Sequence, residues 1–254
     1  VNYRGNLDMY RIAGRFGESD FGAKFKGKFT KAMKRNTLAV EFYDDFNTYN
    51  QDTVNAKNNI LGIQPSYNIV SDDYSLKLGV NLGVESDSGF FVLPDLEASY
   101  SFSDQKFTIL AGWTGEVQKN SFYSTTEQNP FVFVPQDLRN TRMHKFFGGL
   151  KVALEGVQFQ GILSQKLVKN LQLYQNDTSA YRLFNTTYDD GSIFNIHGEV
   201  LVTMIKNLEI DAVFDFNTYN LDNEARAWHL PNFEGNLSAA YRLLDDKLKV
   251  KAEL

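Results

Sequence analysis

Alternation between apolar and polar residues runs through this sequence from one end to the other. In DFGAKFKGKFTK, residues 20–31, phenylalanines and small residues alternate with Lys24, Lys26 and Lys28. The same period of two recurs in SLKLGVNLGVE, KFTILAGWTGEV, VQFQGILSQK, LEIDAVFDF and KLKVKAEL. Successive side chains of a strand point to opposite faces, so each segment is predicted to be a β-strand with one apolar and one polar face.

The whole chain is predicted to be all-β. About 13 strands are expected. Their expected lengths exceed the roughly 5–6 residues usual for strands of soluble sheets, and they suit tilted strands that cross a membrane in about 9–11 residues. Their expected ranges are 2–14, 20–32, 37–46, 58–70, 75–86, 90–102, 105–119, 143–155, 157–169, 192–205, 207–218, 231–243 and 246–254. An aromatic content of 14% favours strands as well.

The expected connections alternate in length. Tight turns are placed near 31–36, 71–74, 103–105, 155–157, 205–207 and 244–246, and the connections between them include long ones at 45–57, 118–143, 168–192 and 217–230. In an up-and-down meander, alternate connections lie at the same end, so the tight turns share one rim and the long loops share the other. This asymmetry is typical of transmembrane antiparallel β-barrels of the bacterial outer membrane. A soluble antiparallel sheet with one wet face is the alternative.

In the barrel interpretation the apolar faces contact lipid and the polar faces line the lumen. A lysine on the lipid face at the midplane costs about 2–4 kcal/mol. The face of residues 20–31 that carries three lysines is therefore expected to point to the lumen. The predicted lumen-lining residues are Lys24, Lys26, Lys28, Lys77, Glu97, His197, Glu199, Asp211 and Asp215. Ion pairs between neighbouring strands are expected to neutralise charges on this face, with Glu41 and Asp45 beside the lysine stretch, and with Asp95 and Glu97 between the strands that carry Lys77 and Lys106. A role of these charges in substrate binding is the alternative.

Aromatic residues gather towards the expected strand ends. They are Phe91, Tyr100, Trp113, Phe146, Phe216, Phe233 and Tyr241. Such rings suit the interface between membrane and water, although ordinary packing explains any single one.

The sequence shows no pattern for catalysis, cofactor binding or metal binding. His144, His197 and His229 lack metal-ligand spacing, and there is no nucleophile motif or phosphate-binding glycine loop. With no cysteine, thiol chemistry and disulfides are excluded. A net charge of −5 does not indicate a nucleic-acid partner. The chain is therefore not expected to be an enzyme.

The long loops at 119–143 and 170–191 are rich in Tyr, Phe, Asn and Thr. Such surfaces bind through aromatic anchors and adaptable hydrogen bonds, although packing of the loops on one another is equally consistent. The candidates for extracellular contact are Phe122, Tyr123, Phe131, Phe133, Tyr174, Tyr181, Phe184 and Tyr188.

The second half of the chain resembles the barrel region of TonB-dependent-receptor-like outer-membrane proteins of Bacteroidota. The resemblance rests on VPQDLRNTRMHKFFGGL leading into a hairpin, on a Tyr/Asn/Asp-rich outer loop, and on AWHLPNF entering a strand with a hairpin after it. Members of that family have a plug inside a barrel of about 22 strands. No plug segment is visible between residues 1 and 254, which are interpreted as one partial barrel domain. Because bacterial single-chain barrels have an even number of strands, the complete protein is expected to have 14 or more.

The resemblance implies transport or surface recognition in the outer membrane of a bacterial cell. The implied partners are outer-membrane lipid and either the TonB system or other outer-membrane or surface lipoprotein subunits. A plugless, porin-like barrel that serves as a structural or accessory subunit of a larger complex is the alternative function. A soluble ligand-binding β protein is the third.

Overall fold

The computed structural model describes residues 1–14, 17–51, 54–86, 89–132, 137–177, 183–243 and 247–254. The strands are β1 (Asn2–Ala13), β2 (Ser19–Met33), β3 (Asn36–Gln51), β4 (Val54–Lys57), β5 (Ile60–Val70), β6 (Tyr74–Glu85), β7 (Gly89–Phe102), β8 (Phe107–Gln118), β9 (Thr141–Leu154), β10 (Val157–Asn176), β11 (Phe184–Val202), β12 (Leu208–Leu221), β13 (Phe233–Leu243) and β14 (Leu248–Glu253), and the helix is α1 (Phe122–Gln128). The all-β prediction is confirmed, and the short β4 is added to the expected strands.

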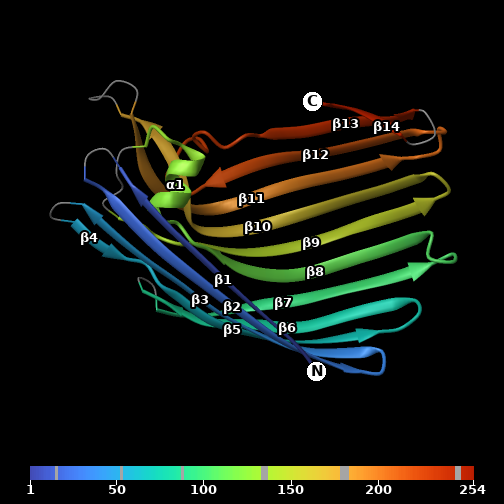
Figure 1. Cartoon of the computed structure of the whole chain (residues 1–254), viewed down its shortest axis with the longest axis horizontal. Coiled ribbons are helices and arrows are strands. Elements are labelled where there is room, and N and C mark those ends of the chain that lie inside the picture. The colour runs from blue at the N-terminus through green and yellow to red at the C-terminus, as the bar shows by residue number, and fades with distance from the viewer. Residues whose placement is uncertain (15–16, 52–53, 87–88, 133–136, 178–182, 244–246) are drawn as a thin grey trace.

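All strands belong to one antiparallel sheet with the order of a simple meander. Each strand pairs with the next along the path β1-β2-β3-β5 and onward to β14, and β4 pairs with β3. Figure 1 shows that this sheet is strongly curved, with the tight turns at one rim and the long connections and α1 at the other. Within the described residues β1 and β14 do not pair with each other, so these strands form an open curved wall.

Large apolar side chains cover the outer face of the sheet. Every strand on the pairing path exposes at least one of them, among them Leu7, Phe25, Phe42, Leu61, Leu78, Val92, Ile109, Phe146, Leu163, Phe194, Phe216, Leu237 and Val250. We call this surface the apolar belt. A soluble monomer rarely exposes a continuous apolar patch of more than a few hundred Å², so the belt needs an apolar environment.

The concave face is polar, and its curvature brings side chains together across intervening strands. Tyr43 on β3 donates a 2.8 Å hydrogen bond to Asn81 on β6, across β5. Gln64 on β5 donates a 2.8 Å hydrogen bond to Asp95 on β7, across β6. Such contacts between next-nearest strands lock the curvature of the wall.

A small apolar cluster on the same face consists of Ile60, Phe91 and Leu93. The expectation that Phe91 lies at the membrane interface is wrong, because the side chain is 3% exposed and its ring covers Gly83. Phe91 has the same parity on β7 as Glu97, so strand alternation already directs it inward. The other six aromatic residues of that prediction are exposed on the sheet.

Two long connections differ from the prediction. The segment 119–143 contains α1, in which Ser121 caps the first turn and Ser124 returns the bond in a capping box. The segment 170–191 is mostly strand, because β10 continues to Asn176 and β11 begins at Phe184. A register shift between Val168 and Leu171 marks where this hairpin extends past the rim. In the described part of the chain, no helix is long and apolar enough to cross a membrane.

Candidate functional site

The strand register places all nine predicted lumen-lining residues on one face of the sheet, the concave one. Lys24, Lys26 and Lys28 alternate with the exposed phenylalanines of β2, and Lys77 lies directly opposite Glu97. His197 lies opposite Asp215, Glu199 opposite Gln160, and Asp211 opposite Leu201. That this face lines a closed lumen remains a prediction.

The lysines of β2 meet the carboxylates of β3, as predicted. Lys24 Nζ lies 3.1 Å from Asp45 Oδ2, and Lys28 Nζ lies 3.7 Å from Glu41 Oε2. Lys26 lies between them, opposite Tyr43. Because both lysines are partly exposed, these pairs balance charge along the wall and add little to stability.

A second group of charges lies on β6 and β7. Lys77 Nζ lies 2.6 Å from Asp95 Oδ1 and 2.9 Å from Glu97 Oε1, which confirms the predicted pairing for Lys77. The expected position of Lys106 beside these carboxylates is wrong, because Lys106 lies in the turn before β8 and Glu97 is opposite Gly112. Further along the face, His197 Nδ1 lies 3.1 Å from Asp215 Oδ2. Asn195 donates to the same carboxylate at 3.0 Å and to Asn217 at 3.0 Å. The polar side chains of β11 and β12 therefore satisfy one another.

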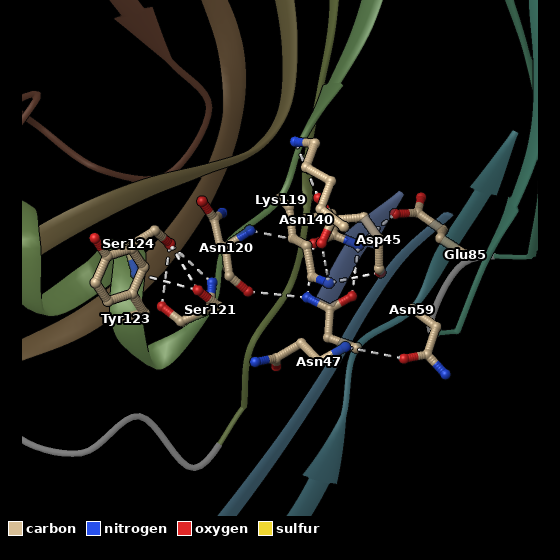
Figure 2. A network of polar contacts seen from close by, with 12 residues as sticks. Asp45, Asn47, Asn59, Glu85, Lys119, Asn120, Ser121, Tyr123, Ser124 and Asn140 are labelled. Carbon is tan, nitrogen blue, oxygen red and sulfur yellow. Dashed lines mark hydrogen bonds and ion pairs between the residues drawn. The ribbon is translucent and has the colours of Figure 1, made fainter. Parts of the chain in front are cut away.

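A buried amide network joins distant segments at the long-connection rim (Figure 2). Asn58 donates to Asn140 Oδ1 at 2.7 Å, and Asn140 donates back to Asn58 Oδ1 at 2.9 Å. Asn140 also donates to Glu85 Oε2 at 2.7 Å, and Asn58 donates to the carbonyl of Asn120 at 2.9 Å. Buried hydrogen-bond clusters of this kind favour one backbone arrangement, so the network holds the long connection against the wall.

Lys119 links that connection to the first strands. Its Nζ donates to the main-chain carbonyl and to Oδ1 of Asp45, both at 2.6 Å. Burial lowers the pKa of Lys119, and the bond to Asp45 opposes that shift. Asp45 therefore forms ion pairs with Lys24 from the wall and with Lys119 from the connection at the same time.

The helix α1 bridges the two sides of the concave face. The main-chain N–H of Tyr123 donates to Asp20 on β2 at 2.9 Å, and the Tyr123 ring stacks on Tyr10 with centroids 4.5 Å apart. On the other side, Gln172 on β10 donates to Thr125 at 3.0 Å. A seven-residue helix has little stability of its own, so these contacts keep it in place.

The predicted contact residues lie in several settings. Phe122 is 7% exposed and packs on Tyr49, so this ring is part of the packing and the expectation of a surface loop position is wrong. Tyr174, Phe184 and Tyr188 lie in strands and not in a loop, because the hairpin of β10 and β11 continues beyond the rim. The exposed Phe131, which follows α1, and the half-buried Tyr123 of α1 remain candidates. Phe133 and Tyr181 lie outside the described residues.

Asp189 anchors the connection 222–232 to β11. Its carboxylate accepts hydrogen bonds from the main-chain N–H groups of Asn223 and Glu224 at 2.9 and 2.7 Å, and from the Asn223 side chain at 2.8 Å. Burial acts to raise the pKa of Asp189, but these hydrogen bonds and one from Asp190 N–H outweigh it and hold the pKa below its usual value. The ionised carboxylate therefore stabilises the loop.

Solved structures with the same fold include outer-membrane receptors and an iron transporter. The siderophore receptor PirA from Pseudomonas aeruginosa matches with a TM-score of 0.68 and 15% identity, over 94% of this chain and 48% of that one. The ferripyoverdine receptor of the outer membrane of Pseudomonas aeruginosa matches with a TM-score of 0.61 and 12% identity, over 98% and 42%. The FrpB iron transporter from Neisseria meningitidis matches with a TM-score of 0.63 and 11% identity, over 92% and 42%.

The curved antiparallel sheet of this chain has the same fold as part of each of these proteins. This chain spans less than half the length of these receptors, and at such low identity the likeness shows the fold alone. No protein-family model matches the sequence, and no curated protein matches it. The solved structures come from Pseudomonas, Acinetobacter and Neisseria, so they lend no support to the expected origin in Bacteroidota.

Proposed function

We propose that this chain forms part of the wall of a bacterial outer-membrane β-barrel that binds and transports a ligand without catalysing a reaction. The observation that carries the proposal is the apolar belt, which reaches every strand on the pairing path while the opposite face is charged and hydrogen-bonded. In hydrocarbon, only a sheet whose backbone groups are all paired is stable. A curved sheet with lipid outside and water inside satisfies both faces.

Closure of this barrel requires strands beyond those described here. The edges at β1 and β14 have backbone groups without a neighbouring strand among the described residues, and exposed edges are unfavourable in lipid. This chain covers less than half of each of the solved receptor chains. We therefore infer that the barrel is completed by further strands that pair with β1 and β14.

The direction of the wall follows from its rims. The rim with the tight turns corresponds to the periplasmic side. The opposite rim corresponds to the extracellular side, and it contains α1, the long hairpin of β10 and β11, and residues 222–232. Ligand recognition belongs on the extracellular rim. Uptake driven by the TonB system fits a receptor of this shape.

A second candidate is a plugless accessory subunit of a larger outer-membrane assembly, with lipoprotein subunits as partners. One observation favours it: α1, which belongs to this chain, covers part of the concave face and is held there by hydrogen bonds with Asp20 and Gln172. Loss of ligand uptake after removal of the TonB protein would favour the transporter, and unchanged uptake would favour the accessory role.

Fractionation of cells that produce the full-length protein tests the proposal. We expect the protein in the outer-membrane fraction, extractable only with detergent, and migrating faster on a gel before boiling than after, because a closed barrel resists unfolding by detergent. A protein that stays soluble and monomeric without detergent contradicts the proposal.

A further inference from the structure

A hollow of about 520 Å³ interrupts the apolar belt over β7, β8, β9 and β10. Its floor is a row of small residues, Ala98, Ala111 and Gly148, which lie opposite one another on three neighbouring strands. Glu97 borders the same hollow, but its side chain pairs with Lys77 on the concave face, so the adjacent Ala98 and its row point to the outer face. The volume is within the range of small-molecule sites.

At Gly148 the hollow is open down to the main chain. A Cβ atom added there would meet one atom within 4 Å, the main-chain oxygen of Leu110 at 3.9 Å. Gly198 lies on the same outer face, but the ring of Phe214 covers it. Because protein interiors and interfaces are close-packed, the uncovered space at Gly148 indicates that a group from outside this part of the chain fills it.

Large side chains enclose the floor on two sides. Trp113 and Phe146 stack with ring centroids 5.3 Å apart on the side nearer the long connections, and Ile109 and Leu150 lie opposite each other on the side nearer the tight turns. Trp113 and Ile109 are four residues apart on β8, which corresponds to about 13 Å between their backbones. An α-helix with its side chains is about 10–12 Å wide, so it does not fit between these side chains, whereas a single hydrocarbon chain does.

Gln165 places an amide at the edge of this hollow. It lies on β10 between Leu163 and Leu167, which are 54% and 48% exposed in the apolar belt, and opposite Phe146 and Phe194. Its side chain makes no hydrogen bond to the described residues, and its amide atoms are open to the surface. A polar group without a partner is unfavourable in hydrocarbon, so the amide indicates a bound group that pairs with it.

We propose that this hollow binds one acyl chain of a membrane lipid, and that a hydroxyl group on this chain pairs with Gln165. A hydroxyl group both donates and accepts hydrogen bonds, so it matches either atom of the amide. The ester groups of a lipid lie at the level of its headgroup, whereas Gln165 lies within the apolar belt, so the partner belongs to the chain itself. The surrounding bilayer supplies the chain because the hollow is continuous with the belt, and in this respect the inference rests on the proposed function.

Native mass spectrometry of the delipidated full-length protein in detergent tests this assignment. The probes, offered together in equal amounts, are two phosphatidylethanolamines, one with myristoyl chains and one with 3-hydroxymyristoyl chains. We expect the protein to retain the hydroxylated lipid about three to ten times more than the plain lipid, which is the preference expected for one hydrogen bond.

Two variants separate the hollow from the amide. Gly148→Leu fills the hollow and should lower the retention of both lipids about tenfold, the loss expected when about two methylene groups no longer fit. Gln165→Leu leaves the hollow open, so this variant should retain lipid without a preference. Gly5→Leu is the control, because a Cβ atom at this glycine of β1 meets no atom within 4 Å and the position lies outside the hollow. It should leave retention and preference unchanged.

Equal retention of the two lipids by the parent protein would overturn the assignment, as would retention that Gly148→Leu does not change or a preference that persists in Gln165→Leu. Gln165→Leu replaces one belt side chain by another, so it keeps the proposal testable even if Gly148→Leu does not fold. Any of these results from a protein that enters the outer membrane contradicts this inference alone. A protein that stays soluble without detergent contradicts the proposed function.

Discussion

Glu85 on β6 and Arg142 on β9 form an ion pair that spans the two strands between them, β7 and β8. Glu85 is 2% exposed and also accepts the hydrogen bond from Asn140. The Arg142 guanidinium lies over the Phe91 ring, 5.6 Å from its centroid. This contact joins the amide network at the rim to the apolar cluster of the concave face.

Replacement of Arg142 is expected to destabilise the protein strongly. Arg142→Met removes the guanidinium that pairs with the buried Glu85 carboxylate, which costs about 3–5 kcal/mol for a buried pair broken on one side. The measurement is the free energy of unfolding in urea of the membrane-inserted protein. Arg139→Met is the control, because Arg139 pairs with Asp137 in an exposed position and should change stability by less than about 1 kcal/mol. Equal effects of the two variants would contradict the account.

Acidification is expected to release the connection 222–232. The pKa of Asp189 is lower in the folded protein than in the unfolded chain, where it is about 3.9. The ionised carboxylate therefore stabilises the fold above about pH 3.9, and this stabilisation is lost as the pH falls through the pKa of the folded state. Trp228 lies in this connection and donates to Glu224 at 3.1 Å, so its fluorescence reports the release. In a Trp113→Phe background we expect a transition below about pH 4.

Asp189→Asn provides the control for that titration. The amide has no charge to lose, so the transition below about pH 4 should be absent from this variant. A transition that persists in Asp189→Asn, or one centred above pH 5 in the parent protein, assigns the release to another group.

The sequence predicts the wall better than it predicts the rim. Alternation sets both the strands and their faces, because the side-chain period of a strand is exactly two. For that reason the pairing of Lys24 with Asp45 and of Lys77 with Asp95 follows from residue order alone. Applied to β7, the same rule predicts that Phe91 shares the concave face with Glu97, because the two residues are an even number of positions apart.

The rim depends on contacts between residues far apart in the chain. Asn58 and Asn140 are 82 positions apart, and asparagine in a connection is as typical of a turn as of a buried network. The helix α1 has a local signal in Ser121 and Ser124, which form its capping box. Its position against Asp20 and Gln172 depends on the curvature of the sheet, which no short sequence pattern specifies.

A glycine of the concave face is expected to be essential for close packing. At Gly112, a Cβ atom would lie 2.6 Å from Phe147 Cε1 and 2.7 Å from the main-chain oxygen of Leu96. Gly112→Ala should therefore cost about 1–3 kcal/mol through overpacking. Gly5→Ala on β1 meets no atom within 4 Å and should be neutral or slightly stabilising. Unfolding in urea distinguishes the two, and a neutral Gly112→Ala would show that the Phe147 ring is free to move.

The central claim, lipid on one face of the wall and water on the other, is tested most directly at two neighbouring residues of β2. Phe25 is 49% exposed in the apolar belt, and Lys26 points to the concave face. Because the chain has no cysteine, Phe25→Cys and Lys26→Cys each give one site for a nitroxide spin label. In membranes, oxygen collides preferentially with labels in lipid and a water-soluble nickel complex with labels in water. We predict a high ratio of oxygen to nickel collisions at Phe25→Cys and a low ratio at Lys26→Cys. Equal ratios, or the reverse order, would contradict the membrane wall.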